Sequence, residues 1–336
     1  MKDQASDIMF SFVAPVYNEA KGLEQFYQRL KTVAEGLGEN YEIILVNDGS
    51  TDSSLEIIRS LAERDSAVRY VDFSRNFGHQ AAVTAGYDYA CGRAVISLNS
   101  DCQHPPEIIP QLVEKWHCGA EVVYTIRTDP DAVSGARRWL GRCLYRAIAR
   151  VSGMDLIDQA DFRLLDRKAV LALRGLREQA RFVRGLVRWI GFKQASHPYK
   201  AQGRQAGASG YSWRQLSGMA MAGLLNFSLV PLRAVGAMGA LMLLAGVLYL
   251  AIAGVLALLG LAPFSGLAML LLTVGGLQLT CLAAVGEYVG RIYEQSKGRP
   301  LYIVRHARGF ELDEEMDAIE PPSRQSEDDS HFSVMT

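Results

Sequence analysis

The chain has 336 residues, about two domains at ~150 residues each, and its charges nearly cancel, with 35 Lys and Arg against 36 Asp and Glu. This balance excludes a general nucleic-acid-binding protein, which would carry a strong basic excess. Hydrophobic residues make up 49% of the chain. That supply of core material excludes a disordered or collagen-like chain.

Residues 8–127 alternate between two kinds of segment. Short runs rich in β-branched residues occur at 8–14, 41–46, 68–73, 94–98 and 122–126. Segments with helical spacing of apolar residues lie between most of them, at 23–37, 53–64, 80–90 and 106–116. This alternation is typical of an α/β fold in which a mainly parallel sheet carries helices on both faces. Ligands in such folds bind beyond the carboxyl ends of the strands.

Polar residues gather directly after four of these strands, at 15–19, 47–50, 74–79 and 99–103. One such segment alone is an ordinary turn or helix cap, as Asp52 and Ser53 would be before a helix. Four of them on neighbouring strand ends predict a binding site. Neither GxGxxG nor GxxxxGK(S/T) follows the first strand, which disfavours Rossmann dehydrogenases and P-loop nucleotidases.

The segment after the fourth strand carries candidate metal ligands. Asp101 and Gln103 are hard oxygen ligands that suit Mg²⁺ or Mn²⁺ bridging a diphosphate. An ion there would neutralise the charge on a departing nucleotide. His79 and His104 lack the Cys or His partners that a zinc site needs. The five cysteines are scattered, so we expect free thiols.

Residues 234–286 carry no charge. One bilayer crossing needs ~20 residues, and residues 262–266 supply a Pro/Gly break near the middle. We therefore expect two transmembrane helices within 234–290, at about 234–260 and 266–287. A buried helical hairpin in a soluble core is the alternative, although such helices are rarely apolar on every face. Basic residues flank the run and residues 1–7 do not resemble a signal peptide, so both termini should be cytoplasmic.

Basic residues and no acidic ones occupy 181–233. Within that stretch, residues 211–233 combine Trp213 with Met, Leu and small polar residues and predict an interfacial amphipathic helix suited to membrane lipids. A solvated basic face is the alternative. Residues 291–310 would form a juxtamembrane segment, and 311–336 have the acidic composition of a disordered tail. Gly275 and Gly276 favour helix association and a homo-oligomer.

Five segments together resemble the family-2 glycosyltransferases, which have the GT-A (Rossmann-like) fold. They are VAPVYNE at 13–19, VNDGSTD at 46–52, SRNFGH at 74–79, ADFRLLDR at 160–167 and RFVRGL at 181–186. With the two expected membrane helices, they are most similar to polyprenyl-phosphate glycosyltransferases such as dolichyl-phosphate mannose synthase and the bactoprenol glucosyltransferases. The resemblance covers roughly residues 8–310 and identifies residues 1–210 as a cytoplasmic GT-A domain.

The resemblance implies a reaction as well as a fold. One sugar would pass, with inversion, from a UDP- or GDP-linked donor to polyprenyl (undecaprenyl) phosphate at the bacterial inner membrane. The product would be a lipid-linked sugar for modification of cell-envelope glycans. By position, the residues implied to bind the nucleotide-sugar are Pro15, Tyr17, Glu19, Asp48, Asn76 and Ser100, with Asp48 reaching the base.

The resemblance also assigns the metal and the acceptor. Asp101, Gln103 and Asn99 would hold Mg²⁺ or Mn²⁺, Asp101 being essential to catalysis. The acceptor phosphate would meet Arg127, Arg163 and Arg204. Asp161 lies where the family places a catalytic carboxylate. Because a lipid phosphate is already ionised at neutral pH, orienting the acceptor loop is the alternative role for Asp161. The family pattern is Asp-x-Asp-x-Gln, so Asn99 removes one negative charge and should weaken metal affinity.

Two other functions remain open on the sequence. A processive polysaccharide synthase would carry Gln-x-x-Arg-Trp, but no Gln stands in that position before Arg188 and Trp189. A catalytically degenerate scaffold is favoured by Asn99 and Gly210, where the family has Asp and Lys. A transporter is disfavoured because the hairpin contains no charge. The donor is not determined: UDP-glucose, UDP-N-acetylhexosamine and GDP-mannose are all compatible.

Overall fold

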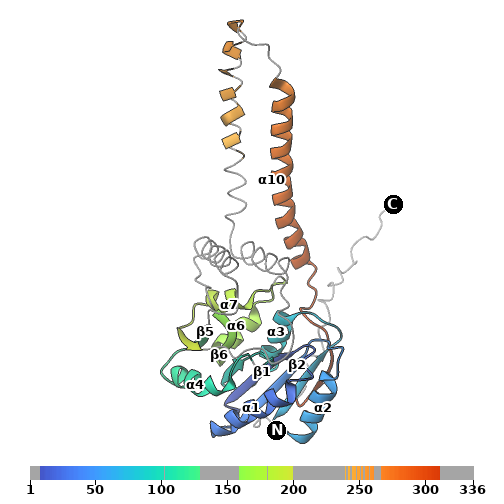
Figure 1. Ribbon diagram of the computed structural model, residues 1–336, viewed down its shortest axis with the longest axis vertical. Coiled ribbons are helices and arrows are strands. Elements are labelled where there is room, and N and C mark those ends of the chain that lie inside the picture. Colours follow the sequence, from blue (N-terminus) through green and yellow to red (C-terminus); the bar gives the residue numbers. More distant parts are fainter. Residues whose placement is uncertain are drawn as a thin grey trace, which may run out of the picture.

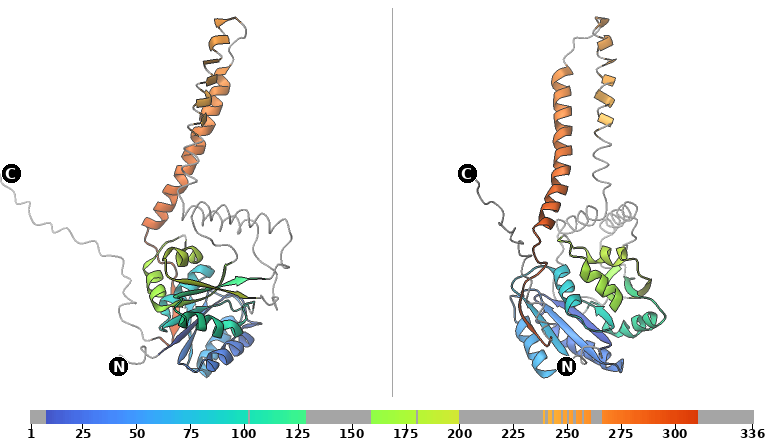
Figure 2. Two further views of the ribbon diagram at one scale, coloured as in Figure 1. Left: turned by 90° about the vertical axis from the view of Figure 1, so that its left-hand side faces the viewer. Right: turned by 180° about the vertical axis from the view of Figure 1, so that it is seen from behind.

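The computed structural model describes residues 8–101, 103–128, 159–179, 181–199, part of 239–260, and 266–310. Within these residues the centre of the molecule is an eight-stranded sheet of order β7-β5-β6-β4-β1-β2-β3-β8 (Figure 1). Helices cover both of its faces, and one long helix projects away from it (Figure 2). The arrangement confirms the expected α/β class.

The first half of the sheet follows the predicted alternation closely. Its four strands run parallel: β1 (Phe10–Val16), β2 (Tyr41–Asn47), β3 (Val68–Phe73) and β4 (Ala94–Ser97). The helices between them are α1 (Leu23–Gly36), α2 (Ser54–Arg64) and α3 (His79–Tyr89). Each observed boundary lies within two residues of the predicted one, because strand and helix periodicity differ sharply in these segments.

Two hydrophobic cores lie on opposite faces of the sheet. Successive strand residues point to opposite faces, so Phe12 belongs to the core with α1 and α2, whereas Val13 belongs to the core with α3. Gly86 lets α3 lie directly on β1. A Cβ at that position would come 2.0 Å from Cγ1 of Val13. This close approach sets how α3, whose first residue is His79, lies over β1.

The second half of the sheet contains an antiparallel strand that the sequence did not reveal. β6 (Gln159–Asp166) lies between β4 and β5 (Val122–Arg127) and runs opposite to both. β7 (Gln194–Tyr199) adds to β5 in parallel. The covering helices are α4 (Ile109–His117) with the 3₁₀ turn η2 (Pro106–Ile108), α6 (Arg167–Gly175) and α7 (Val183–Trp189). Ser97 pairs with Arg163, so β6 begins beside the carboxyl end of β4.

The last described part of the chain is helix α10 (Gly266–Ser296) followed by strand β8 (Val304–Arg308). The helix is nine residues longer than the predicted 266–287 because it continues through charged residues to Ser296. β8 pairs antiparallel with the edge strand β3. Among the described residues, no helix combines the length and apolarity that crossing a bilayer requires. The predicted interfacial helix at 211–233 and the tail at 311–336 lie outside the described residues.

Candidate functional site

The carboxyl ends of β1, β2, β3 and β4 lie on one rim of the sheet, as the sequence predicted. We call the loops after β1, β2 and β3 (residues 17–22, 48–53 and 74–78) the first half of the rim. The second half consists of the loop after β4 (residues 98–104), the start of β6 and helix α7. The two halves are built differently, so each is described separately.

Side chains hold the first two loops of the first half together. Asn18 adopts a left-handed φ of 55°, and its Oδ1 accepts a hydrogen bond from the backbone N–H of Thr51 at 2.8 Å. The N–H groups of Asn18 and Glu19 donate to the hydroxyls of Ser50 and Ser54. A short polar side chain such as Asn tolerates this backbone conformation. Hydrogen bonds between these two loops therefore shape this part of the rim.

Asp48 ties the second loop to the third. Its buried carboxylate accepts hydrogen bonds from the N–H groups of Phe77 at 2.7 Å and Gly78 at 3.0 Å. Burial raises the pKa of Asp48, and these two N–H donors oppose that rise. Gly49 makes the approach possible: its φ is +64°, and a Cβ there would lie 2.5 Å from the carbonyl carbon of Arg75. The structure thus shows Asp48 holding a loop, and its contact with a base stays a prediction.

The loop after β4 is fastened to β1. The buried Ser100 hydroxyl donates to the carbonyl oxygen of Pro15 at 2.8 Å. Asp101 accepts the N–H of Gln103 through Oδ1 at 3.1 Å, which turns the loop. Asn99 and Asp101 are both partly exposed at the rim. The sequence predicts that Ser100 contacts the nucleotide-sugar. In the structure its hydroxyl bonds to Pro15 and so holds the loop that carries the candidate metal ligands.

The candidate metal ligands fit a particular kind of ion. Asp101, Asn99 and Gln103 offer one carboxylate and two amide oxygens. Mg²⁺ binds to one or two carboxylates and takes its other ligands from water and phosphate oxygens. The described part of the chain holds no group of three or more His, Cys, Asp or Glu residues that could form an all-protein cage. The donor set therefore fits an ion shared with a phosphorylated ligand rather than a structural zinc.

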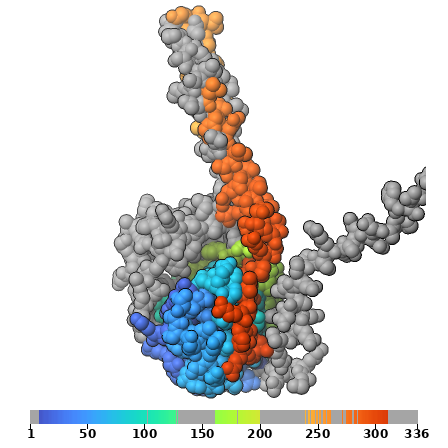
Figure 3. Space-filling view, turned by 90° about the vertical axis from the view of Figure 1, so that its right-hand side faces the viewer, coloured from blue at the N-terminus to red at the C-terminus, as the bar shows by residue number. Residues whose placement is uncertain are grey.

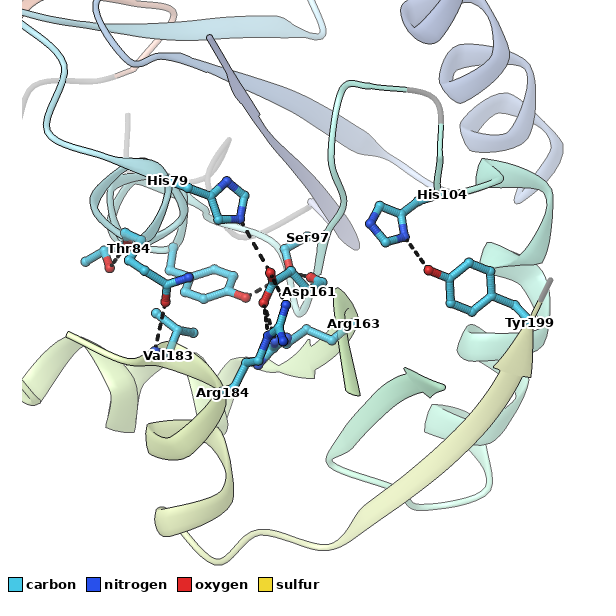
Figure 4. Close-up of polar contacts among 11 residues, drawn as sticks. His79, Thr84, Ser97, His104, Asp161, Arg163, Val183, Arg184 and Tyr199 are labelled. Atoms are coloured by element: carbon cyan, nitrogen blue, oxygen red, sulfur yellow. Dashed lines mark hydrogen bonds and ion pairs between the residues drawn. The ribbon is translucent and has the colours of Figure 1, made fainter. Parts of the chain in front are cut away.

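The second half of the rim centres on Asp161, at the start of β6 (Figure 4). Arg184 of α7 donates to both of its carboxylate oxygens, Nε to Oδ1 at 2.8 Å and Nη2 to Oδ2 at 2.7 Å. Arg163 adds a third bond, Nη2 to Oδ1 at 3.0 Å. Nε2 of His79, the first residue of α3, lies 3.7 Å from Oδ2. Four elements of the fold thus converge on one carboxylate or on its backbone, since Ser97 of β4 donates to the Asp161 carbonyl.

This arrangement sets the chemistry of Asp161. Burial alone would raise the pKa of its carboxyl group, but the charge and hydrogen bonds of Arg184, with His79 and Arg163, hold that pKa well below its usual range. A carboxylate that is so strongly stabilised is a poor proton acceptor near neutral pH. The structure shows Asp161 holding Arg184 and Arg163, and both predicted roles of Asp161, catalytic carboxylate or orientation of the acceptor loop, stay predictions.

A second histidine lies near the metal-ligand candidates. His104 is buried, and its Nδ1 lies 2.9 Å from the hydroxyl oxygen of Tyr199 at the end of β7. Both rings pack with Phe162, which neighbours Asp161 on β6. This aromatic group links the loop after β4 to β6. Of the two histidines that the sequence offered, His104 is therefore hydrogen-bonded to Tyr199, whereas His79 lies beside the Asp161 carboxylate.

The remaining predicted residues divide into three groups. Tyr17 and Asn76 are exposed on the first half, Tyr17 at 46%, and Glu19 is partly exposed beside them. Arg163, by contrast, has a side chain only 2% exposed. Arg127 ends β5 beside the start of β6, whereas Arg204 lies outside the described residues. Sequence reasoning missed Arg184, which stood in a quoted motif without a role, and treated His79 only as a zinc candidate.

Comparisons with known proteins show which family the chain belongs to. Residues 11–171 match the model of Glycosyl transferase family 2. The uncharacterized glycosyltransferase YkcC of Bacillus subtilis (strain 168) is 42% identical over 308 residues, 90% of this chain and 95% of that protein. Bactoprenol glucosyl transferase of Shigella phage SfV is 35% identical over 89% of this chain and 98% of its own. The chain therefore belongs to glycosyl transferase family 2, and it is a glycosyltransferase.

A solved structure shows the same kind of fold. A crystal structure of glucosyl-3-phosphoglycerate synthase from Mycobacterium tuberculosis superposes with a TM-score of 0.50 over 66% of this chain and 78% of that one, at 19% identity. That identity supports likeness of fold alone. The chain thus has a GT-A-like α/β fold with a mostly parallel sheet, as the resemblance implied.

Proposed function

We propose that this protein transfers one sugar from a nucleotide-sugar to polyprenyl phosphate. The observation that carries the proposal is the near full-length similarity to proteins named bactoprenol glucosyl transferase, 35% identical over 89% of this chain. Those names make UDP-glucose the first donor to test, with UDP-N-acetylhexosamine and GDP-mannose as competitors. The lipid-linked sugar would serve cell-envelope glycan modification.

The first half of the rim is the proposed donor site. Tyr17 presents an exposed ring beside the locked loops, which suits stacking against a base. Glu19, Asp48 and Asn76 lie on the same three loops. Pro15 and Ser100 support the site through the bond between them. Because the loops are held in place before any ligand arrives, donor binding costs little ordering.

The proposed cofactor is Mg²⁺ or Mn²⁺ on Asp101, Asn99 and Gln103. When bound, the ion would neutralise charge on the departing nucleoside diphosphate. Asp101 is the one carboxylate of this ligand set. Its Oδ1 accepts the N–H of Gln103, and that turn presents the carboxylate at the rim between the two halves.

The second half of the rim is the proposed acceptor site. A lipid phosphate is ionised at neutral pH, so its oxygen can attack without a general base. Arg127, Arg163 and Arg204 are the cations proposed for that phosphate. Arg163 would act from beneath the surface, because its guanidinium is buried against Asp161. Asp161 would hold Arg163 and Arg184 at the correct distance from the acceptor.

The proposal places the enzyme in the bacterial inner membrane, with both termini cytoplasmic. It rests on the uncharged run at 234–286 and on the exposed apolar side chains of α10, among them Leu271, Leu282 and Ile292 at 64%, 68% and 68% exposure. Water is a poor solvent for such a surface. Residues 211–233 would lie in the interface, and Gly275 and Gly276 would favour a homo-oligomer.

The test is transfer itself. Membranes containing the full-length protein are incubated with undecaprenyl phosphate and, separately, with each labelled nucleotide-sugar, and the lipid fraction is then extracted. A single labelled sugar on lipid supports the proposal. A long polymer would instead favour the processive synthase. The absence of product from every donor, in well-expressed protein, would favour the scaffold.

A further inference from the structure

The chain after α10 returns to the sheet at an unexpected place. We call residues 297–310 the C-terminal strap. Figure 3 shows α10 projecting from the α/β unit and this segment, in red, running down the side of the unit beside α2 and α3. Val304–Arg308 forms β8 on the edge of β3. β3 leads directly into the loop whose N–H groups donate to Asp48. The strap therefore contacts the first half of the rim through β3.

The strap holds Ser74, the first residue after β3, from two sides. The N–H of Ser74 donates to the carbonyl oxygen of Ile303 at 3.0 Å. The carbonyl oxygen of Ser74 accepts a bond from Nη2 of Arg305 at 2.6 Å. The pairing of β3 with β8 shifts register between Asp72 and Phe73, just before this point. The strap therefore sets the direction in which the loop leaves the sheet.

Aromatic packing carries the contact further into the rim. Tyr302 stacks on Phe73 with ring centroids 5.0 Å apart, and Phe73 meets Phe77 edge-on at 5.7 Å. Phe77 is the residue whose N–H donates to Asp48 at 2.7 Å. Packed aromatic rings thus connect the strap to Phe77, whose backbone N–H bonds to the Asp48 carboxylate.

The same part of the chain also contacts the connection that leads into the second half of the rim. The Tyr302 hydroxyl donates to Asp88 at 2.8 Å, and Asp88 pairs with both terminal nitrogens of Arg177. Gln295, in the last turn of α10, accepts the N–H of Gln179 and donates to the carbonyl oxygen of Arg177. Residues 177–179 belong to the connection from α6 to α7, which carries Arg184. The end of α10 is therefore bonded to the connection that leads into α7, while the strap contacts the first half.

We infer that the C-terminal strap is a positioning element for donor binding, with Arg305 and Tyr302 acting through the 74–78 loop on Asp48. The strap makes the geometry of the donor loop depend on how α10 meets the α/β unit. If α10 is held in a membrane, the donor site is complete only when the helix end and the strap are in register with the sheet. This inference rests on the proposed function for the identity of the ligand alone.

The chain supplies a matched pair of variants. Arg305→Ala removes the bond to Ser74 from an exposed side chain, so the fold should persist. Arg308→Ala removes the same charge from the same strand, but Arg308 faces Glu63 of α2 at 3.6 Å. Tyr302→Phe keeps the ring on Phe73 and removes only the bond to Asp88. Arg305→Ala tests the contact with the loop. Arg308→Ala controls for the loss of net charge, and Tyr302→Phe controls for the link to Arg177.

Two measurements on full-length protein in detergent test the inference. Hydrogen exchange at the Phe77 and Gly78 amides should be faster in Arg305→Ala and unchanged in Arg308→Ala. The donor KM should rise ~5-fold in Arg305→Ala, the size expected for one lost hydrogen bond. Acceptor KM and kcat should not change. Tyr302→Phe should leave exchange at these two amides unchanged, because its ring still packs on Phe73.

The outcomes are distinguishable. Unchanged exchange in Arg305→Ala would overturn the inference, and so would faster exchange with an unchanged donor KM, since the strap would then be merely structural. An equal effect from Arg308→Ala would assign the change to charge and overturn it as well. If the wild type transfers no sugar, the proposed function fails. In that case the dissociation constants of UDP and GDP are measured by separate titrations. These constants replace the donor KM and test the inference independently of the proposed function.

Discussion

The two halves of the rim are stabilised by different kinds of interaction. In the first half, backbone N–H groups donate to short polar side chains, as Thr51 does to Asn18 and as Phe77 does to Asp48. In the second half, one carboxylate binds the charged groups of two arginines with a histidine beside them. The first half is therefore a rigid cradle with little net charge. The second is a cluster of charged side chains around one carboxylate.

The two halves should therefore respond differently when a carboxylate is replaced by an amide. Replacing a carboxylate by an amide in the first half leaves its N–H donors with an acceptor. The same change in the second half leaves cations without a counter-charge in a largely buried place. Single substitutions can therefore test whether the halves differ in the way the structure indicates.

The largest expected effect is at the boundary between the halves. Asp101→Asn removes the single carboxylate of the metal-ligand set, and we expect turnover to fall by at least ~100-fold, comparable to the loss of one strong electrostatic contact in a transition state. Asn99→Asp should lower the Mn²⁺ or Mg²⁺ concentration needed for half-maximal rate. Retention of most activity in Asp101→Asn, or insensitivity of the wild type to EDTA, would refute the metal assignment.

The next effect compares the halves directly. Asp161→Asn leaves Arg184 and Arg163 without their counter-charge and should destabilise the protein by about 2–4 kcal/mol. Asp48→Asn keeps an oxygen to accept from Phe77 and Gly78 and should cost less than ~1 kcal/mol. Denaturant unfolding of the full-length variants, followed by tryptophan fluorescence, measures both. Equal losses would mean that the two halves do not differ as described.

What the sequence could reveal follows the same division. The first half is made of loops that each follow a strand of the regular alternation of strands and helices. Asn18, Asp48 and Asn76 could therefore be placed on one rim from strand periodicity alone. In the second half, Asp161 lies on β6 and Arg184 on α7, two elements outside that alternation. β6 runs against its neighbours, which its composition does not signal, and no local pattern pairs a polar strand such as β8 with an edge 231 positions away.

A smaller effect tests the close approach inside the first half. Gly49→Ala should cost about 2–3 kcal/mol, because strain from a left-handed backbone adds to the collision of the new Cβ with Arg75. Gly38 is the matched control. Its φ is +71° with nothing within 4 Å of the added Cβ, so Gly38→Ala should cost only ~1 kcal/mol. The difference between the two midpoints of thermal unfolding isolates the loop contact. Equal shifts would show that the loops are not tightly packed.

The smallest effect is the pH dependence of stability, which should have opposite signs in the two halves. The pKa of Asp161 is lowered in the folded state, since Arg184 and the other neighbouring cations outweigh burial. Its contribution to stability is therefore complete above the unfolded value of ~3.9 and is lost as the pH falls through the folded pKa. The pKa of Asp48 is raised by burial. Its carboxyl group therefore favours the folded state below ~3.9, and stability is lost as the pH rises through the folded pKa.

Subtracting the unfolding free energy of each Asn variant from that of the wild type isolates the carboxyl group concerned, because the amide does not titrate. For Asp161, this difference should be flat between pH 7 and pH 5 and should fall below about pH 4, near the carboxyl value of the unfolded chain. For Asp48, it should decline on going from about pH 4 toward neutrality. Two curves of the same sign would contradict the distinction between a buried cradle carboxylate and a carboxylate held by arginines.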